Sequence, residues 1–369
     1  LFNLFIHILT AILILFLTKK VLYYAYPNYF KLLPLFVALL FAVHPINTSA
    51  IAYIFSRAEP LAAFFYILSL LIFIRTFEKS KKFYIYSLLC FFLSLCSKQI
   101  AVTLPAIILM FDYIWLSNFE IKKVLEKKRY HIPFWVILIL YLLFRYFYLG
   151  GIGDLEAQST WSRYSYFTMQ PYVVLRYIQL LLIPVGLCID HFLVPPKTIF
   201  EFRIFVSFAV IIGIVVLMYI LYRKRSNISK IVLFCILWFF ITLLPTSSFF
   251  PTTSALVDNR VYLPSFGFYL GIVLFYFLMF GKKDSVKKRN TILLVNVVGI
   301  HIILLSMMTF SRNKLFQNPI LLWQDVISKY PYSSRAHNNL GVVYHKRKDY
   351  NESLKKFKKA IELNQKNDK

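Results

Sequence analysis

Acidic side chains are scarce in this sequence. Only 16 residues are Asp or Glu, against 42 that are Lys or Arg, and the net charge is +26. Charged residues of both signs make up 16% of the chain, whereas a soluble domain has about a quarter. A nucleic-acid-binding protein would also be basic, but here the cations lie in short stretches between apolar runs. The composition therefore favours a membrane protein and argues against nucleic acid as a partner.

Cysteine is scarce as well and follows no ligand spacing. All four cysteines lie inside apolar runs without a CxxC pair, at Cys90, Cys96, Cys188 and Cys235. Isolated cysteines of this kind behave as small buried hydrophobic residues. The sequence therefore predicts no metal site, and its cysteines do not indicate a redox compartment.

Long apolar runs, in contrast, are abundant. Hydrophobic residues make up 59% of the chain, and its mean hydropathy is +0.65. A helix needs about 20 residues to cross ~30 Å of hydrocarbon. Ten runs approach this length, near 1–18, 32–47, 60–77, 83–97, 99–117, 132–149, 203–222, 231–245, 263–281 and 291–310. They predict an all-α fold, a polytopic transmembrane helical bundle. The first run has no basic stretch before it and no cleavage site, so it does not indicate a signal peptide.

Five basic clusters predict the topology of this bundle. They follow alternate runs, at 19–31, 75–82, 122–129, 223–230 and 282–289. Lys and Arg in short loops favour the cytoplasmic side, so segments 44–60, 149–202 and 246–262 are expected on the external side. The apolar stretch 170–189 then lies in a segment that begins and ends outside, and we expect a re-entrant or interfacial helix there. Leu1 also falls outside, and we expect at least one further span before it.

A polar segment with helical periodicity follows residue 310. Residues 334–367 form a 34-residue unit that matches the tetratricopeptide pattern. Its signature positions hold Leu340, Gly341, Tyr344, Ser353, Phe357 and Ala360, and half of a preceding repeat is indicated by Trp323, Val326 and Pro331. We therefore expect a transmembrane domain over 1–310 and an extracytoplasmic repeat segment over 311–369. One and a half repeats cannot bury a solenoid core alone, so this segment either continues or packs on the membrane domain, as a peptide-binding groove or as a structural cap.

Charged side chains beside apolar spans are costly, so they are candidates for function. The candidates are the cations Arg57, Lys98 and Arg260, the carboxylates Glu59 and Asp258, and the lining residues His44 and Tyr262. All lie on the predicted external side, where one cavity would suit the phosphate or pyrophosphate head group of a lipid-borne substrate. Local ion pairs and snorkelling lysines are the structural alternatives. Secondary candidates are Asp154, Glu156, Asp190 and His191, while Asp112 is expected to cap a helix or mark the interface.

Four stretches resemble one family of membrane enzymes. They read FAVHPINTSAIAYIFSRAEPLAAFF at 41–65, LSLCSKQIAVTLPAIILMFDYIW at 93–115, LPTSSFFPTTSALVDNRVYLPSFG at 244–267 and WQDVISKYPYSSRAHNNLGVVY at 323–344. In this order, and joined to a tetratricopeptide repeat, they are similar to C-type membrane glycosyltransferases. These include the transmembrane and tetratricopeptide-repeat protein O-mannosyltransferases and their bacterial relatives. Gln99 departs from the pattern, since relatives often have Glu or Pro there.

The resemblance implies an inverting transfer of a sugar, often mannose, from a polyprenyl-phosphate donor to a Ser or Thr hydroxyl. In such a reaction a carboxylate takes the hydroxyl proton, and cations stabilise the departing lipid phosphate. In the family the key Asp lies in the first external loop, which would precede Leu1. The resemblance makes Glu59 a candidate second acid with a catalytic role and Arg260 a donor-phosphate contact, beside Arg57 and Lys98.

The same resemblance implies partners and a location. The donor is a substrate, so no cofactor is expected; the partners are membrane lipids, the polyprenyl-phosphate-sugar donor, and an acceptor protein or peptide held by the repeat. The protein is expected to be multi-pass, in a bacterial plasma membrane or the endoplasmic reticulum membrane. A membrane-anchored scaffold without catalysis is the alternative function. A transporter predicts internal duplication, which the sequence does not show.

Overall fold

The computed structural model describes residues 1–26, 31–53, 56–151, 162–196, 198–247, 251–252, 254–280 and 288–367. Every regular element within these ranges is a helix, which confirms the all-α class. The α-helices are α1 (Phe2–Ala25), α2 (Leu33–Val43), α3 (Thr48–Ile51), α4 (Ala58–Glu78), α5 (Tyr84–Ser97), α6 (Leu104–Phe111), α7 (Ile121–Glu126), α8 (Lys128–Leu149), α9 (Arg163–Leu182), α10 (Phe202–Lys224), α11 (Asn227–Leu243), α12 (Ser265–Phe280), α13 (Lys288–Gln317), α14 (Pro319–Lys329), α15 (Ser334–Lys346) and α16 (Tyr350–Asn367). Short turns between them are η1 (Pro45–Asn47), η3 (Lys81–Phe83), η4 (Gln99–Thr103), η5 (Asp112–Leu116) and η6 (Asp258–Val261).

Most of the predicted apolar runs form helices of membrane-spanning length. Among the described residues, six helices are long and apolar enough to span, or seven if α2 and the bent segment Pro45–Ile51 count as one. Helices α11 and α12 are apolar but shorter, with 17 and 16 residues, and α5 has 14. A helix satisfies its own backbone hydrogen bonds, which the bilayer core requires. The chain is therefore a multi-pass membrane protein.

The bundle has a packed centre and a lipid-facing periphery. In the most apolar stretch of Gln99–Leu116, 67% of residues are buried, whereas the figure is 11% for α10. Large rings fill the centre, where Tyr66, Trp238 and Phe266 are fully buried and meet edge to face. Such aromatic pairs add to the apolar area that each ring buries. The exposed apolar faces of α8, α10 and α13 are therefore among the surfaces suited to face lipid.

Two helices of the centre come unusually close to each other. At Gly267 on α12, an added Cβ would lie 2.6 Å from the backbone oxygen of Cys235 on α11 and 3.2 Å from the Trp238 ring. Glycine is what allows this approach, as small residues do in other membrane helix pairs. The indole Nε1 of Trp238 donates to the Leu263 oxygen at 3.0 Å, which ties α11 to the segment just before α12.

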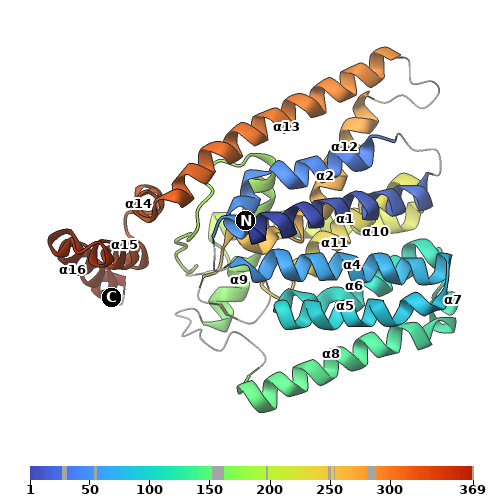
Figure 1. The fold of residues 1–369 in the computed structure, drawn as a ribbon, viewed down its shortest axis with the longest axis horizontal. Coiled ribbons are helices and arrows are strands. Elements are labelled where there is room, and N and C mark those ends of the chain that lie inside the picture. The colour runs from blue at the N-terminus through green and yellow to red at the C-terminus, as the bar shows by residue number, and fades with distance from the viewer. Residues whose placement is uncertain are drawn as a thin grey trace.

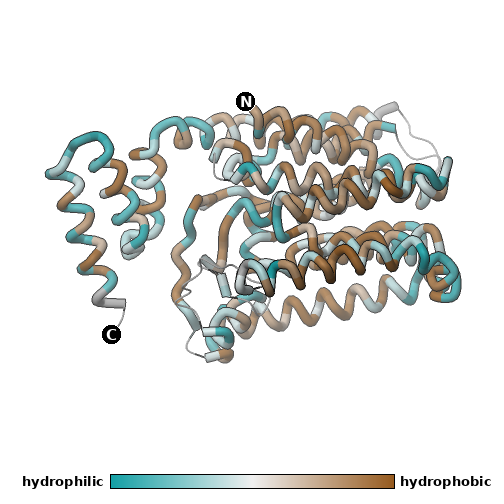
Figure 2. Tube along the Cα trace, turned by 60° about the horizontal axis from the view of Figure 1, so that its bottom comes forward, coloured by the Kyte–Doolittle hydropathy of each residue, from teal (hydrophilic) through white to brown (hydrophobic). Residues whose placement is uncertain are grey.

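All spans share two ends, which we call the repeat end and the basic end. The repeat end holds Leu1, the start of α4, the end of α5 and helices α14 to α16, while α7 lies at the opposite, basic end (Figure 1). Figure 2 shows hydrophobic helices flanked by more hydrophilic segments at both ends. The predicted external segments thus gather at the repeat end. Residues 281–287, in the fifth basic cluster, lie outside the described residues.

Helix α9 lies across the repeat end instead of running along the spans (Figure 1). Near its start the Tyr166 hydroxyl donates to the Thr246 oxygen at 2.7 Å. Near its finish, the oxygen of Leu181 lies 3.1 Å from Nε2 of His44. The helix stops at Leu182, just before Pro184. It therefore matches the interfacial alternative, although it begins seven residues earlier than the predicted 170.

Helices α15 and α16 pair as the tetratricopeptide pattern predicts. A Cβ on Gly341 would meet the Phe357 ring at 2.8 Å, and Ser353 Oγ donates to the Gly341 oxygen at 3.0 Å. Small residues therefore bring the two helices together across the seam. Helix α13 runs unbroken through residue 310 to Gln317, so the division into domains at that residue remains a proposal.

The close approach of α11 and α12 yields a stability prediction. Gly267→Ala should destabilise the bundle by about 1–3 kcal/mol, because the new methyl group must push a backbone oxygen aside. Gly271→Ala, one turn further along α12, meets nothing within 4 Å and should be neutral or stabilising by up to ~1 kcal/mol. Thermal unfolding of both variants in detergent measures the difference, and equal midpoints would contradict this account of Gly267.

Candidate functional site

A cavity of about 570 Å³ opens at the repeat end of the bundle. Its lining comes from the start of α4, the end of α5 with η4, the end of α8, and the segments around residues 245 and 252–260. The lining residues are Glu59, Leu95, Cys96, Ser97, Lys98, Gln99, Ile100, Val102, Thr103, Tyr141, Leu142, Arg145, Leu244, Pro245, Thr246, Pro251, Thr252 and Arg260. Three predicted site residues, Glu59, Lys98 and Arg260, thus share one cavity.

Glu59 and Lys98 form an ion pair at the cavity wall. Helix α4 begins with Glu59 in its first turn, where a carboxylate interacts favourably with the helix dipole. Helix α5 ends at Ser97, and the extended backbone of Lys98 turns its side chain back toward α4. Lys98 Nζ donates to Glu59 Oε1 at 2.5 Å, and Glu59 is only 3% exposed while Lys98 is 35% exposed. The carboxylate of this ion pair is therefore buried, whereas its counter-ion Lys98 is partly exposed to solvent.

Arg260 is held in place by its own loop. Its Nη1 donates to the backbone oxygens of Ser254 at 2.8 Å and Ala255 at 3.2 Å, and its Nη2 donates to Thr252 Oγ1 at 2.9 Å. The guanidinium is half-buried and contributes to the cavity lining. These contacts fix the direction of the Arg260 side chain in the folded protein. Less rotamer entropy is therefore lost when the guanidinium binds a ligand.

Arg145, near the end of α8, was not among the predicted site residues. Its Nη1 lies 3.5 Å from the Tyr141 hydroxyl. With the Gln99 side-chain amide oriented so that its oxygen faces α8, that oxygen accepts from Arg145 Nη2 at 2.6 Å. A charged residue inside the apolar run 132–149 is the signal that could have found it. Among the described residues that line the cavity there are thus three cations and one carboxylate.

The other four predicted residues are not among the described residues that line this cavity. Arg57 is exposed. His44 is buried, with Nδ1 accepting from the Ile46 backbone N–H at 3.2 Å. The Tyr262 hydroxyl is buried against His7 Nδ1 at 2.7 Å. The assignment of these residues to the site remains a prediction. In the structure, His44 and Tyr262 are buried and form hydrogen bonds within the bundle.

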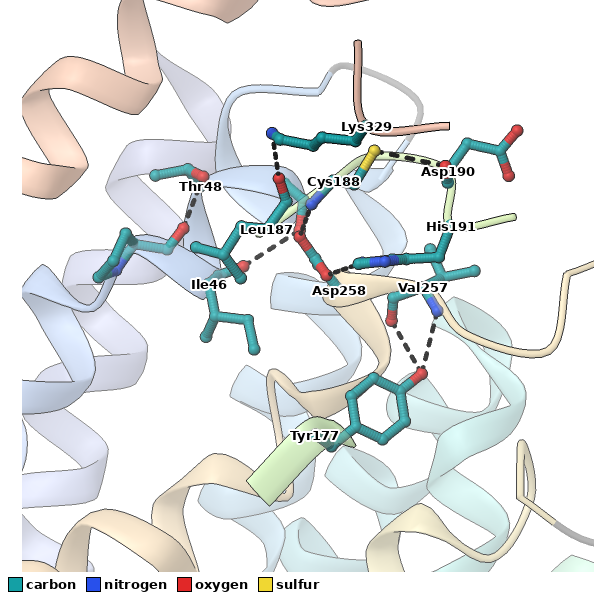
Figure 3. Close-up of polar contacts among 12 residues, drawn as sticks. Ile46, Thr48, Tyr177, Leu187, Cys188, Asp190, His191, Val257, Asp258 and Lys329 are labelled. Carbon is teal, nitrogen blue, oxygen red and sulfur yellow. Dashed lines mark hydrogen bonds and ion pairs between the residues drawn. The ribbon is translucent and has the colours of Figure 1, made fainter. Parts of the chain in front are cut away.

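Asp258 lies in a second, buried polar cluster between the bundle and the repeat segment. Its Oδ1 is 2.7 Å from His191 Nε2, and its Oδ2 accepts from the backbone N–H of Cys188 at 2.9 Å. Figure 3 shows His191 pointing at Asp258 and Lys329 pointing at Leu187. Burial raises the pKa of the Cys188 thiol to about 12, so this cysteine stays protonated. The secondary candidate His191 therefore belongs to this cluster and not to the cavity.

Arg312, at the repeat end of α13, completes this cluster. It donates from Nη2 to Asp258 Oδ2 at 2.9 Å, from Nη1 to the Leu187 oxygen at 2.8 Å, and from Nε to Thr48 Oγ1 at 2.9 Å. Only 9% of Arg312 and 1% of Asp258 are exposed. A buried ion pair is stable only when its other donors and acceptors also form hydrogen bonds. Here Arg312 also donates to Leu187 and Thr48, and Asp258 also has Cys188 and His191 as partners.

The repeat segment docks on the same cluster. The Tyr330 hydroxyl lies 2.9 Å from His191 Nδ1, and Lys329 Nζ donates to the Leu187 oxygen at 2.8 Å. Burial, as the main cause, raises the pKa of Tyr330 to about 12, so its hydroxyl keeps its proton. Cys188 also packs with Val326 and Ala336 in a small apolar cluster. The repeat segment is therefore joined to the bundle by both polar and apolar contacts.

The remaining predicted residues are placed as follows. Asp112 is fully buried at the basic end, where it pairs with Lys127 at 2.6 Å and His131 at 2.7 Å. Asp154 and Glu156 lie outside the described residues. Within the described residues, His, Cys, Asp and Glu form no group of three that could hold a metal ion.

Comparisons with known proteins agree with this architecture, a polytopic helical membrane protein that carries a docked tetratricopeptide repeat. The tetratricopeptide repeat family model matches residues 334–367. Protein O-mannosyl-transferase F38B6.6 of Caenorhabditis elegans is 28% identical over 321 residues, which is 83% of this chain and 42% of that protein. No solved structure matches.

Two human proteins show the same likeness. Protein O-mannosyl-transferase TMTC4 is 27% identical over 348 residues, covering 83% of this chain and 46% of its own length. Protein O-mannosyl-transferase TMTC3 is 24% identical over 358 residues, covering 88% and 38%. The chain thus spans less than half the length of these curated relatives. It is distantly homologous to the protein O-mannosyl-transferases, as the sequence resemblance indicated.

The buried Asp258 cluster yields a second stability prediction. Asp258→Ala should cost roughly 3–5 kcal/mol, because it leaves the Arg312 guanidinium buried without its counter-ion. The control is Glu120→Ala, which removes an exposed pair with Lys123 and should cost at most about 1 kcal/mol. Thermal unfolding in detergent measures both. A loss at Asp258 no larger than that at Glu120 would show that this cluster does not hold the repeat segment in place.

Proposed function

We propose that this chain belongs to a membrane glycosyltransferase that moves a sugar, most simply mannose, from a polyprenyl-phosphate donor to Ser or Thr hydroxyls of an acceptor protein. One observation carries the proposal: within the described part of the chain, the cavity at the repeat end is lined by three cations and one buried carboxylate. Homology to protein O-mannosyl-transferases gives the reaction class. The alternative, a scaffold without catalysis, offers no reason for this concentration of charge beside apolar spans.

The cations suit a departing lipid phosphate. In the proposed step the bond between the sugar C1 and the phosphate oxygen breaks, and the phosphate leaves with the electron pair. Arg260, Lys98 and Arg145 lie where they can stabilise that developing charge. Apolar side chains such as Leu244 and Ile100 line the same cavity, so a phosphate on a polyprenyl chain can reach the cations without leaving the membrane surface.

The carboxylate suits the acceptor hydroxyl. As the sugar C1 forms its bond to the Ser or Thr oxygen, that hydroxyl releases a proton, which a carboxylate can accept. Glu59 is the carboxylate among the described residues that line this cavity. Glu59 is therefore our candidate for a catalytic role. Lys98, which donates to Glu59 Oε1, also contributes to the proposed donor site.

The repeat segment is the proposed acceptor arm. A groove between α15 and α16 is lined by Ser334, Arg335, Asn338, Phe357, Ala360, Ile361 and Asn364. Amide side chains such as Asn338 and Asn364 can hydrogen bond an extended peptide backbone, while Phe357 and Ile361 offer apolar contacts. Helices α15 and α16, which line the groove, lie at the same end of the molecule as the start of α4 and the end of α5, which line the cavity (Figure 1). We therefore propose that an acceptor held in the groove is presented to the cavity.

The donor assignment predicts the effect of Arg260→Ala. In the full-length protein this change should lower kcat/KM for transfer from polyprenyl-phosphate mannose by about 10²–10³, as for other groups that stabilise developing charge. The control is Arg203→Ala, since Arg203 is an arginine of the same end that pairs with Glu201 outside the cavity. Radiolabelled transfer to an acceptor peptide provides the measurement. If Arg260→Ala transferred mannose at the wild-type rate, Arg260 would have no role in the mechanism. If the wild-type protein transferred no mannose, the alternative of a scaffold without catalysis would be favoured.

The proposed location puts cavity and repeat on the extracytoplasmic or lumenal side. In a background without the native cysteines, Lys346→Cys on α15 should react with a membrane-impermeant maleimide from that side. Lys122→Cys on α7 should react only from the cytoplasm, because basic loops are retained there. Labelling of intact and permeabilised vesicles distinguishes the two. Labelling of both positions from one side would overturn the proposed topology.

A further inference from the structure

Arg335, in the first turn of α15, contacts the loop that carries Arg260. Its Nη1 donates to Ser254 Oγ at 2.7 Å, and its Nε lies 3.4 Å from Asp190 Oδ2. Ser254 Oγ donates in turn to Asp190 Oδ1 at 3.2 Å. The three side chains therefore close a triangle between the repeat segment and two outer segments of the membrane domain.

Ser254 is also a residue that holds Arg260. Its backbone oxygen accepts from Arg260 Nη1 at 2.8 Å, while its hydroxyl accepts from Arg335. One residue, 8% exposed, thus joins an arginine of the repeat to an arginine of the cavity. A displacement of Ser254 would remove one of the hydrogen bonds that aim the Arg260 guanidinium.

A second connection reaches Arg260 from the same repeat segment. Asp258 lies two residues before Arg260 on the short turn η6. Its carboxylate contacts His191, whose other ring nitrogen lies 2.9 Å from the Tyr330 hydroxyl at the end of α14. The turn that carries Arg260 is therefore held from the repeat side at two places, Ser254 and Asp258.

We propose that Arg335 is a positioning residue for Arg260, so that docking of the repeat segment sets the affinity of the cavity for the donor phosphate. The proposal rests on the proposed function, in which Arg260 contacts that phosphate. Coupling of this kind is reciprocal. A donor phosphate on Arg260 accordingly favours the docked repeat, and the acceptor arm is held in place when the donor is present.

The test measures binding of the lipid phosphate without sugar transfer. Radiolabelled polyprenyl phosphate is titrated onto the full-length protein in nanodiscs. Arg335→Ala should raise the Kd by roughly 5–30-fold, which lies within the range of coupling between residues that share a partner. Arg335→Lys should restore part of the affinity, because Lys can still reach the Ser254 hydroxyl and Asp190. In the transfer assay kcat/KM for the donor should fall as well, because a displaced Arg260 stabilises the departing phosphate less well.

The matched control is Arg347→Ala. Arg347 ends the same helix, but its Nη2 donates to Asn318 at the start of α14 at 3.2 Å, so its loss should leave the Kd unchanged. Ser254→Ala supplies a second variant if Arg335→Ala folds poorly. It removes the hydroxyl that Arg335 binds and keeps the oxygen that Arg260 binds, and it too should weaken binding.

A double-mutant comparison separates positioning from general stability. In a background of Arg260→Ala, the further change Arg335→Ala should have no effect on the remaining affinity, because its target is gone. Equal losses with and without Arg260 would overturn the inference, as would a wild-type Kd in both Arg335→Ala and Ser254→Ala. If the wild-type protein does not bind polyprenyl phosphate at all, the proposed donor is wrong and this inference falls with it.

Discussion

The burial of one carboxylate organises the repeat end of this molecule. Asp258 is only 1% exposed, and an ionised carboxylate is tolerated at such a depth only with a counter-ion and hydrogen bonds around it. Those partners come from three segments: Arg312 from the end of α13, His191 and the Cys188 backbone from the stretch after α9, and Tyr330 through His191. Loss of any one of these partners would leave a buried charged or polar group without a hydrogen bond. The cluster therefore joins the described segments around residues 188 and 258 to the repeat segment.

A different balance of charge governs the cavity. Its carboxylate, Glu59, is buried, but the cations around it are partly open. Lys98 neutralises Glu59, whereas the Arg260 guanidinium donates to backbone and hydroxyl oxygens, which carry no formal charge. An anion in the cavity can therefore approach this guanidinium without competing with a carboxylate of the described residues. The Asp258 cluster differs, because Arg312 there meets a buried carboxylate directly and also donates to Leu187 and Thr48.

Hydropathy and repeat spacing were sufficient to predict the helical class and the tetratricopeptide pair, because lipid and helix packing impose those patterns on the sequence itself. The basic clusters predicted which segments gather at one end of the bundle. Three cavity residues were also predicted, since charged groups beside spans are conspicuous. Asp258 was expected to line the cavity because it adjoins Arg260. Which side of a short turn faces inward depends on partners that lie 54 and 67 residues away, and local sequence does not encode them. Arg145 was missed because a single cation inside an apolar run also fits a lipid-facing snorkel.

The docked arrangement gives the repeat helices contacts beyond their own seam. A single tetratricopeptide repeat cannot bury its hydrophobic face alone and depends on neighbouring elements. Here α14 and α15 place Val326 and Ala336 against Cys188, and Tyr330 and Arg335 reach polar groups of the membrane domain. The membrane domain is therefore one of the neighbours on which the repeat helices pack. Because Arg335 contacts Ser254, whose backbone oxygen accepts from Arg260, docking of the repeat segment and the placement of the Arg260 side chain share a contact.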